Sequence, residues 1–373
     1  MVTTIALLVA ISIPVSYLFV IYKRDFFQTG NLRVVLACFL WGVGAYYIAV
    51  QVNSELVRSQ LITRDVMVRF TAPIVEEILK CAILIYLIRR SDFTYFVDGA
   101  IYGFTAGIGF AIVENFEYIF SHPSAALALA LARVFSTNLI HATASGSIGI
   151  ALGISRFERA GSSRRLVILL VSVILAMGLH MAFNNLVSGG APIALAILVG
   201  LAGAGLIVGI MRRGLDEMKL WVDEELGTEK RMTHGEAEIV SRFENVDQIL
   251  KSFTARFGPQ NGSLARELLL AQAHIGIYKR TAEKHQEESM RRAAEEQVAE
   301  LRITMDEARK KLGLYCMLYL RGIFPEEGSP ALGRLQLVIE SRGESAKSLK
   351  GTGLWTDLSR KTAKPVPEGE EPV

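Results

Sequence analysis

The sequence predicts an all-α polytopic membrane protein: a bundle of about seven transmembrane helices followed by a cytoplasmic helical tail. Hydrophobic residues make up 51% of the 373-residue chain, and its mean hydropathy is +0.34. Up to about Met211 the apolar residues form runs long enough to cross the ~30 Å hydrocarbon core of a bilayer. Beyond Met211 the chain becomes charged and rich in helix-favouring residues.

Seven apolar runs are predicted to span the membrane. The first is followed, not preceded, by Lys23 and Arg24 and lacks a small-residue cleavage site, so we interpret it as a retained anchor and not a signal peptide. The fifth is too long for one simple crossing; it is tilted, is broken near Arg133, or begins with an interfacial helix. The runs lie near residues 4–22, 34–51, 66–88, 98–120, 125–155, 166–188 and 190–211.

Basic residues lie in alternate connections and so predict the orientation. The connections after the first, third, fifth and seventh runs carry most of the Lys and Arg residues of this half of the chain. Positive charge is retained on the cytoplasmic side. We therefore expect a multi-pass protein with its N-terminus outside and its C-terminus in the cytoplasm.

The chain divides by composition into a transmembrane domain (1–211), a cytoplasmic helical tail (212–350) and a disordered C-terminus (351–373). In the tail, residues 281–320 predict one long amphipathic helix that pairs with 235–256. The apolar run at 312–324 is too short to span and is expected to pack in a small core of the tail. We interpret the tail as an interaction or regulatory appendage, which allows for a cytoplasmic partner.

Cysteine content and net charge exclude two kinds of protein. Cys38, Cys81 and Cys316 form neither a disulfide framework nor a C-x-x-C metal pair. The formal charge of +3 mostly reflects the basic connections, so we expect no nucleic-acid partner.

The third run, 66–88, carries Glu76, Glu77 and Lys80 near its middle. Three charged groups at the centre of a membrane helix cost roughly 8–10 kcal/mol, about twice what the surrounding apolar residues return. Glu76 and Lys80 are four residues apart and are predicted to pair. Glu77 points about 100° away and needs another partner. Intramembrane carboxylates usually face a bundle interior or a water-filled cavity and mark a functional site.

The next three runs also carry polar groups at membrane depth. The fourth has Glu114 one turn after Phe110, with Asn115 beside it, and a face of small residues at Gly99, Gly103 and Gly107 that allows close helix approach. The fifth contains His141, and the sixth contains His180 and Asn184 on one face. Four successive runs with such groups predict one site inside the bundle.

In this order, these motifs resemble the PrsW family of bacterial intramembrane proteases. They are E-E-x-x-K, F-x-x-x-E-N, H-A-x-x-T/S and H-x-x-x-N, and the resemblance covers about residues 60–190. The family is grouped with the CAAX prenyl endopeptidases and the scaffold subunit of gamma-secretase. In the CAAX endopeptidases the F-x-x-x motif ends in His, whereas here it ends in Glu114, so the role of this residue is not carried over directly.

The resemblance implies an intramembrane endopeptidase of the bacterial cytoplasmic (inner) membrane. Its substrate would be a membrane protein, such as an anti-sigma factor or another membrane-anchored regulator. A buried carboxylate suits general acid–base chemistry, and adjacent acids can divide the roles of base and proton holder. His180 and Asn184 are candidate oxyanion donors. The candidate catalytic residues are Glu76, Glu77, Glu114, His141, His180 and Asn184.

Two alternatives stay open. The first is the same activity with a bound metal ion. No H-E-x-x-H motif is present, so a glutamic-type mechanism without a cofactor is favoured. If the protein does depend on a metal, the candidate zinc ligands are Glu77, Glu114, His141 and His180. The second is a non-catalytic membrane scaffold or a proton-coupled transporter. Transport would be favoured by an inverted repeat, and the sequence has none that we detect.

Overall fold

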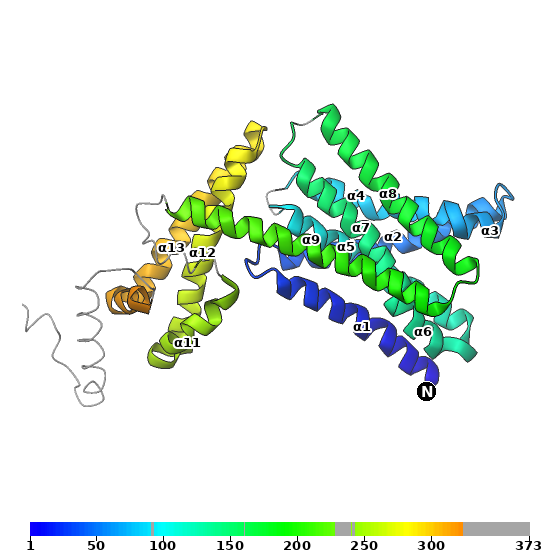
Figure 1. Ribbon diagram of the computed structural model, residues 1–373, viewed down its shortest axis with the longest axis horizontal. Coiled ribbons are helices and arrows are strands. Elements are labelled where there is room, and N and C mark those ends of the chain that lie inside the picture. The colour runs from blue at the N-terminus through cyan, green and yellow to red at the C-terminus, as the bar shows by residue number, and fades with distance from the viewer. Residues whose placement is uncertain (91–92, 160, 228–239, 241–242, 324–373) are drawn as a thin grey trace, which may run out of the picture.

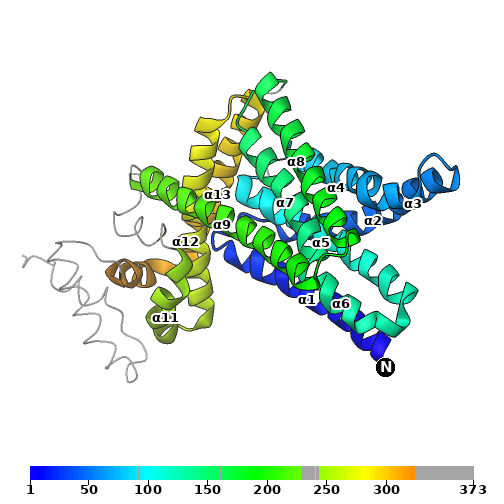
Figure 2. The same cartoon turned by 45° about the vertical axis from the view of Figure 1, so that its right-hand side comes forward.

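The computed structural model describes residues 1–90, 93–159, 161–227, 240 and 243–323, and all of its regular elements are helical. Six helical segments are long and apolar enough to cross a membrane. They contain α1 (Val2–Arg24), α2 (Leu32–Arg58), α5 (Phe96–Ser121), α6 (Ala126–Phe135) continuing into α7 (Thr137–Ser155), α8 (Ser163–Ser188) and α9 (Ile193–Gly227). The prediction of a polytopic all-α membrane bundle is therefore confirmed (Figures 1 and 2).

The third predicted run is the one that does not meet the criteria for a spanning helix. It is divided into α3 (Arg64–Val66), a π-helical turn η1 (Met67–Thr71) and α4 (Ala72–Leu87), and α4 has only 16 residues. Pro73 lies in the first turn of α4, where the preceding helix cannot continue its regular hydrogen bonding. The π-helical turn absorbs this break, and the acidic pair follows one turn later.

Helix α5 is the centre of the bundle, and nearly all of it is buried. It runs antiparallel to α7, with Gly99, Gly103 and Gly107 against the backbone of Gly149, Ser145 and His141, respectively. The backbone of each α7 residue occupies the space in which a Cβ on the facing glycine would lie. The small-residue face is thus confirmed as a close helix contact, and it brings α7 against α5 at the level of His141.

Adding one methyl group to this contact is expected to destabilise the bundle. Gly103→Ala places its Cβ against the Ser145 carbonyl, a rigid backbone group, and overpacking of this kind costs about 1–3 kcal/mol. Gly178→Ala on α8 is the matched control because nothing lies within 4 Å of its Cβ position. Thermal unfolding of both purified variants checks this; equal melting temperatures would contradict the close contact.

The fifth predicted run is broken, as one of the sequence alternatives anticipated. A short 3₁₀ turn, η2 (Pro123–Ala125), leads into α6, and a non-helical Ser136 separates α6 from α7. The break lies three residues after Arg133. It lets α6 pack against α1 while α7 turns into the centre of the bundle.

The tail begins without a break from the last membrane helix. Helix α9 continues through Met211 to Gly227, so the compositional boundary at 211 falls inside one helix. The turn η3 (Phe243–Asn245), α11 (Val246–Phe257), α12 (Pro259–Lys284) and α13 (Glu288–Ile323) follow. The long helix predicted from 281 is wrong at its start, because residues 285–287 separate α12 from α13, and α13 itself kinks at Gly313. The predicted C-terminal disorder lies outside the described residues.

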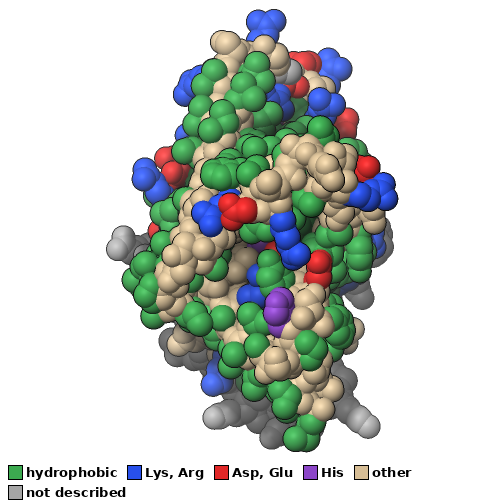
Figure 3. Space-filling view, turned by 90° about the vertical axis from the view of Figure 1, so that its right-hand side faces the viewer, with side chains coloured by type: hydrophobic (Ala, Val, Ile, Leu, Met, Phe, Trp, Pro, Cys, Tyr) green, Lys and Arg blue, Asp and Glu red, His purple; other side chains and the backbone are tan. Residues whose placement is uncertain are grey.

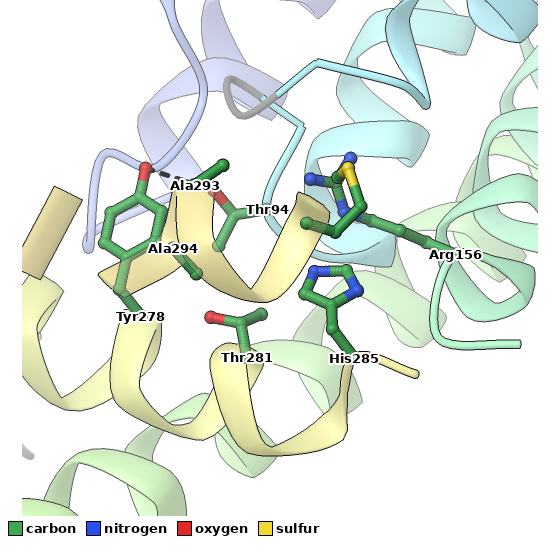
Figure 4. A pocket seen from close by; sticks show the side chains of 8 residues that line it. Thr94, Arg156, Tyr278, Thr281, His285, Ala293 and Ala294 are labelled. Atoms are coloured by element: carbon green, nitrogen blue, oxygen red, sulfur yellow. Dashed lines mark hydrogen bonds between the residues drawn. The ribbon is translucent and has the colours of Figure 1, made fainter. Parts of the chain in front are cut away.

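The helices of the tail pack on one end of the bundle (Figures 1 and 2). His274 of α12 lies 2.6 Å from the Phe27 carbonyl oxygen, and the Thr94 hydroxyl donates to the Tyr278 hydroxyl across 3.5 Å (Figure 4). Cys316 and Leu320 of α13 are buried, but the apolar cluster that contains them continues into the bundle, so the expected separate core of the tail is not what the structure shows.

Candidate active site

Four helices bring the predicted site residues together inside the bundle. Helix α4 supplies Glu76, Glu77 and Lys80, and the other three supply Glu114 (α5), His141 (α7) and His180 (α8). Because α7 packs so closely on α5, His141 comes within hydrogen-bond distance of Glu114. The local folding of α5 and α7 thus fixes one half of the site, and α4 with α8 provides the other half.

Glu77 is the fully buried anchor of the site. Its Oε1 lies 2.6 Å from Lys80 Nζ and 3.0 Å from His180 Nδ1, and Ser145 Oγ donates to its Oε2 at 3.3 Å. The predicted ion pair between Glu76 and Lys80 is therefore wrong, since Lys80 pairs with the acid three residues away. The reason is burial: Glu77 and Lys80 both have 0% exposed side chains, where an unpaired charge would be most costly.

His141 is held between an acid and an amine. Its Nε2 lies 2.9 Å from Glu114 Oε2, and its Nδ1 lies 2.9 Å from Lys80 Nζ. A carboxylate accepts only, and an ammonium donates only, so Nε2 carries the proton and Nδ1 presents a lone pair. Glu114 in turn forms an ion pair with Arg133 of α6 at 2.7 Å.

Glu76 differs from the other acids because one of its oxygens has no partner. Its Oε2 is buried, makes no hydrogen bond within the described residues, and lies 3.9 Å from both His141 Nδ1 and His180 Nε2. His180 Nδ1 faces Glu77, so its Nε2 also presents a lone pair toward Glu76. Three electron-pair donors thus converge: Glu76 Oε2, which has no partner, His180 Nε2, and His141 Nδ1, which accepts a hydrogen bond from Lys80.

This convergence fits a metal ion. Glu76, His141 and His180 each offer one ligand atom, and these atoms lie within 4.8 Å of one another. The other ring nitrogen of each histidine donates a hydrogen bond to a carboxylate. Histidine ligands of metal ions are commonly oriented in this way. Lys80 Nζ donates a hydrogen bond to His141 Nδ1, one of the three candidate ligand atoms. This hydrogen bond would have to break before His141 Nδ1 could bind an ion.

The ligand set expected from the sequence is only partly reproduced. His141 and His180 belong to the converging group, but Glu77 and Glu114 do not. Glu77 forms an ion pair with Lys80, and Glu114 forms one with Arg133. Each of these acids also accepts a hydrogen bond from one of the two histidines, and neither belongs to the converging group.

The cluster opens into a cavity of about 200 Å³. Glu76, Glu114, His180 and Asn184 are among its lining residues, and the others belong mainly to α2, to the chain from α3 to η1 and to the end of α5. Figure 3 shows this end of the molecule as a hollowed face with charged side chains around the opening. The tail lies at the opposite end of the bundle (Figure 1). The cavity therefore opens at the end of the bundle away from the tail.

Asn184 lies outside both the hydrogen-bonded network and the group that converges on Glu76. Its Nδ2 donates to the Val68 carbonyl oxygen across 2.9 Å and so ties α8 to the π-helical turn η1. The amide hydrogens that would bind an oxyanion are thus partly used by the backbone. This bond joins two residues that both line the cavity.

Two residues of the network were not predicted as site residues. Arg133 is the basic residue within the fifth apolar run, and charge complementarity with Glu114 could have indicated the pair. Ser145 follows His141 by four residues and so shares its helical face, a spacing that could have placed it next to Glu77.

The fold and the site define a polytopic membrane protein with a carboxylate–histidine centre inside its helical bundle. Residues 30–211 match the family model described as PrsW family intramembrane metalloprotease, and this part of the chain belongs to the PrsW family. The chain is also similar to the protease PrsW of Clostridioides difficile (strain 630), with 34% identity over 115 residues. That match covers 30% of this chain and 48% of the relative, so the chain spans about half the length of the curated protein it matches. No solved structure matches the chain.

Proposed function

We propose that this protein is an intramembrane endopeptidase that hydrolyses a peptide bond of a membrane protein. The observation that carries the proposal is the buried, unpartnered oxygen of Glu76, which lies 3.9 Å from a ring nitrogen of each of two histidines and belongs to a residue that lines an open cavity. Hydrolysis of an amide within a bilayer needs water and a proton acceptor in a low-dielectric setting, and this cluster offers both a place for water and several acceptors.

We propose further that Glu76, His141 and His180 hold a divalent metal ion of the zinc type. Bound there, the ion would polarise the scissile carbonyl and make water a better nucleophile. Glu77 and Glu114 keep the two imidazoles in the required tautomers. Glu114 also lines the cavity, so it is our candidate for the group that accepts a proton from the attacking water. Lys80 neutralises Glu77 in the interior.

The substrate class follows from where the cavity lies. A segment that enters the cavity must be extended or unwound, because backbone amides inside a helix are shielded by their own hydrogen bonds. We therefore propose a single membrane-anchored regulator, for which an anti-sigma factor is one example, cleaved near the end of its membrane segment. In the proposed orientation the cavity opens on the outer side of the cytoplasmic membrane.

The experiment that tests the function compares membrane-protein fragments in cells that carry the wild type or the Glu76→Gln, Glu77→Gln double variant. We expect one or a few fragments that are present with the wild type and absent with the double variant. Glu117→Gln is the matched control because Glu117 lies on the same cavity and is exposed. Identical fragment sets in wild type and double variant, at equal protein levels, would refute the proposal.

The proposed orientation predicts opposite accessibility for two serines of the loops. All three native cysteines are buried, so a single introduced cysteine can be labelled selectively. In right-side-out membrane vesicles, Ser124→Cys should react with a membrane-impermeant maleimide, whereas Ser163→Cys should react only after permeabilisation. Both positions are exposed. The reverse pattern would invert the topology and the side on which the cavity opens.

A further inference from the structure

A second, larger cavity lies at the end of the bundle that carries the tail. Its volume is about 510 Å³, and it lies between the ends of α4 and α7, the start of α8 and the connection from α12 to α13. It shares no lining residue with the cavity of the candidate active site. The residues used below are Ile85, Ile88, Arg89, Leu152, Arg156, Arg165, Leu169 and Glu287.

The polar end of this cavity is basic. Three arginines and one glutamate line it among the described residues. Arg89 is exposed, and Arg165 is ion-paired with Glu287 at 3.0 Å. Arg156 is only 5% exposed; its Nη1 donates to the carbonyl oxygens of Ile88 and Arg90, while its Nε is buried with no partner among the described residues. An anion is the ligand that these guanidinium groups favour.

His285, which lies beside Arg156, does not change the charge at the polar end of the cavity. Figure 4 shows His285 close to Arg156, where the tail meets the bundle. Burial lowers the pKa of His285 to about 4, so its imidazole is neutral at physiological pH. In addition, α8 begins here with Ser162 as its N-cap, and the amides of its first turn contribute a further partial positive charge.

The other wall of the cavity is apolar and is formed by helices of the bundle. Ile85 and Ile88 come from the end of α4, Leu152 from α7 and Leu169 from the second turn of α8. Ile85 is 39% exposed although it lies in a membrane helix, so this wall is open to a ligand. A basic end at the membrane surface joined to an apolar wall along the hydrocarbon is complementary to an amphiphile.

We propose that this cavity binds one anionic phospholipid, with its phosphodiester on Arg89 and Arg165 and the upper part of an acyl chain along Ile85 and Leu169. Basic pockets between membrane helices are known to bind anionic headgroups. The apolar wall favours a lipid over a soluble phosphate, because a free anion would leave that wall in contact with water. Phosphate and Glu287 compete for Arg165, so the bound lipid also loosens the link between α8 and the tail.

The test titrates delipidated, full-length protein in non-ionic detergent and counts bound ligands by native mass spectrometry. The probes are a short-chain phosphatidylglycerol, a phosphatidylcholine with the same chains, and inorganic phosphate. We expect one phosphatidylglycerol to bind at least about tenfold more tightly than phosphatidylcholine, and inorganic phosphate not to be retained. Arg89→Gln should weaken the binding about fivefold, and Arg89→Gln with Arg165→Gln about thirtyfold.

Arg164→Gln is the matched control. Arg164 neighbours Arg165 in sequence but is 76% exposed, is paired with Glu158 and does not line the cavity. Binding by this variant should equal that of the wild type. Because Arg89 is exposed, the Arg89→Gln variant tests the site even if the double variant folds poorly. Equal binding of the two lipids, full affinity in the Arg89→Gln variant, or displacement of phosphatidylglycerol by equimolar inorganic phosphate would each overturn the proposal.

Discussion

Replacement of Glu76 by Gln is expected to slow peptide-bond cleavage at least about a thousandfold while the metal-free protein melts at the same temperature as metal-free wild type or higher. In our proposal Glu76 is a ligand of the ion that activates the attacking water, and such an ion contributes several kcal/mol, which is on the order of a thousandfold or more in rate. Glu76 Oε2 has no hydrogen bond to lose, and an amide removes a buried charge without changing the volume. Cleavage rates and thermal unfolding of the same preparations check both halves of the prediction.

Glu77→Gln should behave differently, although the two acids are adjacent in sequence. Glu77 is the partner of Lys80, and its loss would leave an unpaired ammonium in the interior, which costs about 3–5 kcal/mol. Adding Lys80→Met should restore most of the stability but not the activity, because His180 still lacks the carboxylate that orients it. If Glu76→Gln cleaves at the wild-type rate, or unfolds as easily as Glu77→Gln, Glu76 is a structural residue and our assignment fails.

Removal of metal is expected to have the second-largest effect. The purified protein should carry about one equivalent of a divalent ion such as zinc, and strong chelators should abolish cleavage, which returns when zinc is added back. An ion that binds only the folded state raises the free energy of unfolding by about 2.7 kcal/mol at a hundred times its dissociation constant. Wild type should therefore melt at a higher temperature with zinc, whereas His180→Gln should show a much smaller shift.

Activity that does not depend on a metal would instead favour the glutamic-type mechanism expected from the sequence alone. Full activity after exhaustive chelation, with no ion retained, would leave Glu76 as the base that activates water directly. Glu117→Gln serves as the control for adventitious binding, since Glu117 is an exposed carboxylate on the same cavity but outside the three-residue group. Its affinity for zinc should equal that of the wild type.

The bundle could be predicted largely from the sequence because membrane helices have a strong local signal. A run of about 20 apolar residues can be recognised without tertiary contacts. The four-residue glycine spacing correctly indicated a face of α5 that another helix approaches closely, and the structure identifies that helix as α7. The third run was less predictable. Its π-helical turn and its 16-residue α4 depend on how Pro73 and the acidic pair are accommodated by neighbouring helices, which no local pattern records.

The members of the site could be predicted, but their pairing could not. Charged groups in an apolar run stand out, so Glu76, Glu77, Glu114, His141 and His180 were all found. Which acid pairs with Lys80 depends on which face of α4 is turned toward α7 and α8. Spacing alone favours Glu76, four residues before Lys80, as its partner. In the structure the fully buried Glu77, three residues before Lys80, forms the ion pair instead. Asn184 bonds the Val68 carbonyl because η1 is non-standard, and that feature is not visible in the sequence.

The central claim is that the cluster around Glu76 hydrolyses a peptide bond inside the membrane bundle. Its most direct test reconstitutes the purified protein with its membrane-protein substrate in lipid nanodiscs in ¹⁸O-labelled water and determines the fragment masses. We predict a single cleavage near the end of the membrane segment of the substrate, with one ¹⁸O atom in the new carboxyl terminus, for the wild type and Glu117→Gln but not for Glu76→Gln. Identical labelled fragments from Glu76→Gln, or no fragment from the wild type, would contradict the claim.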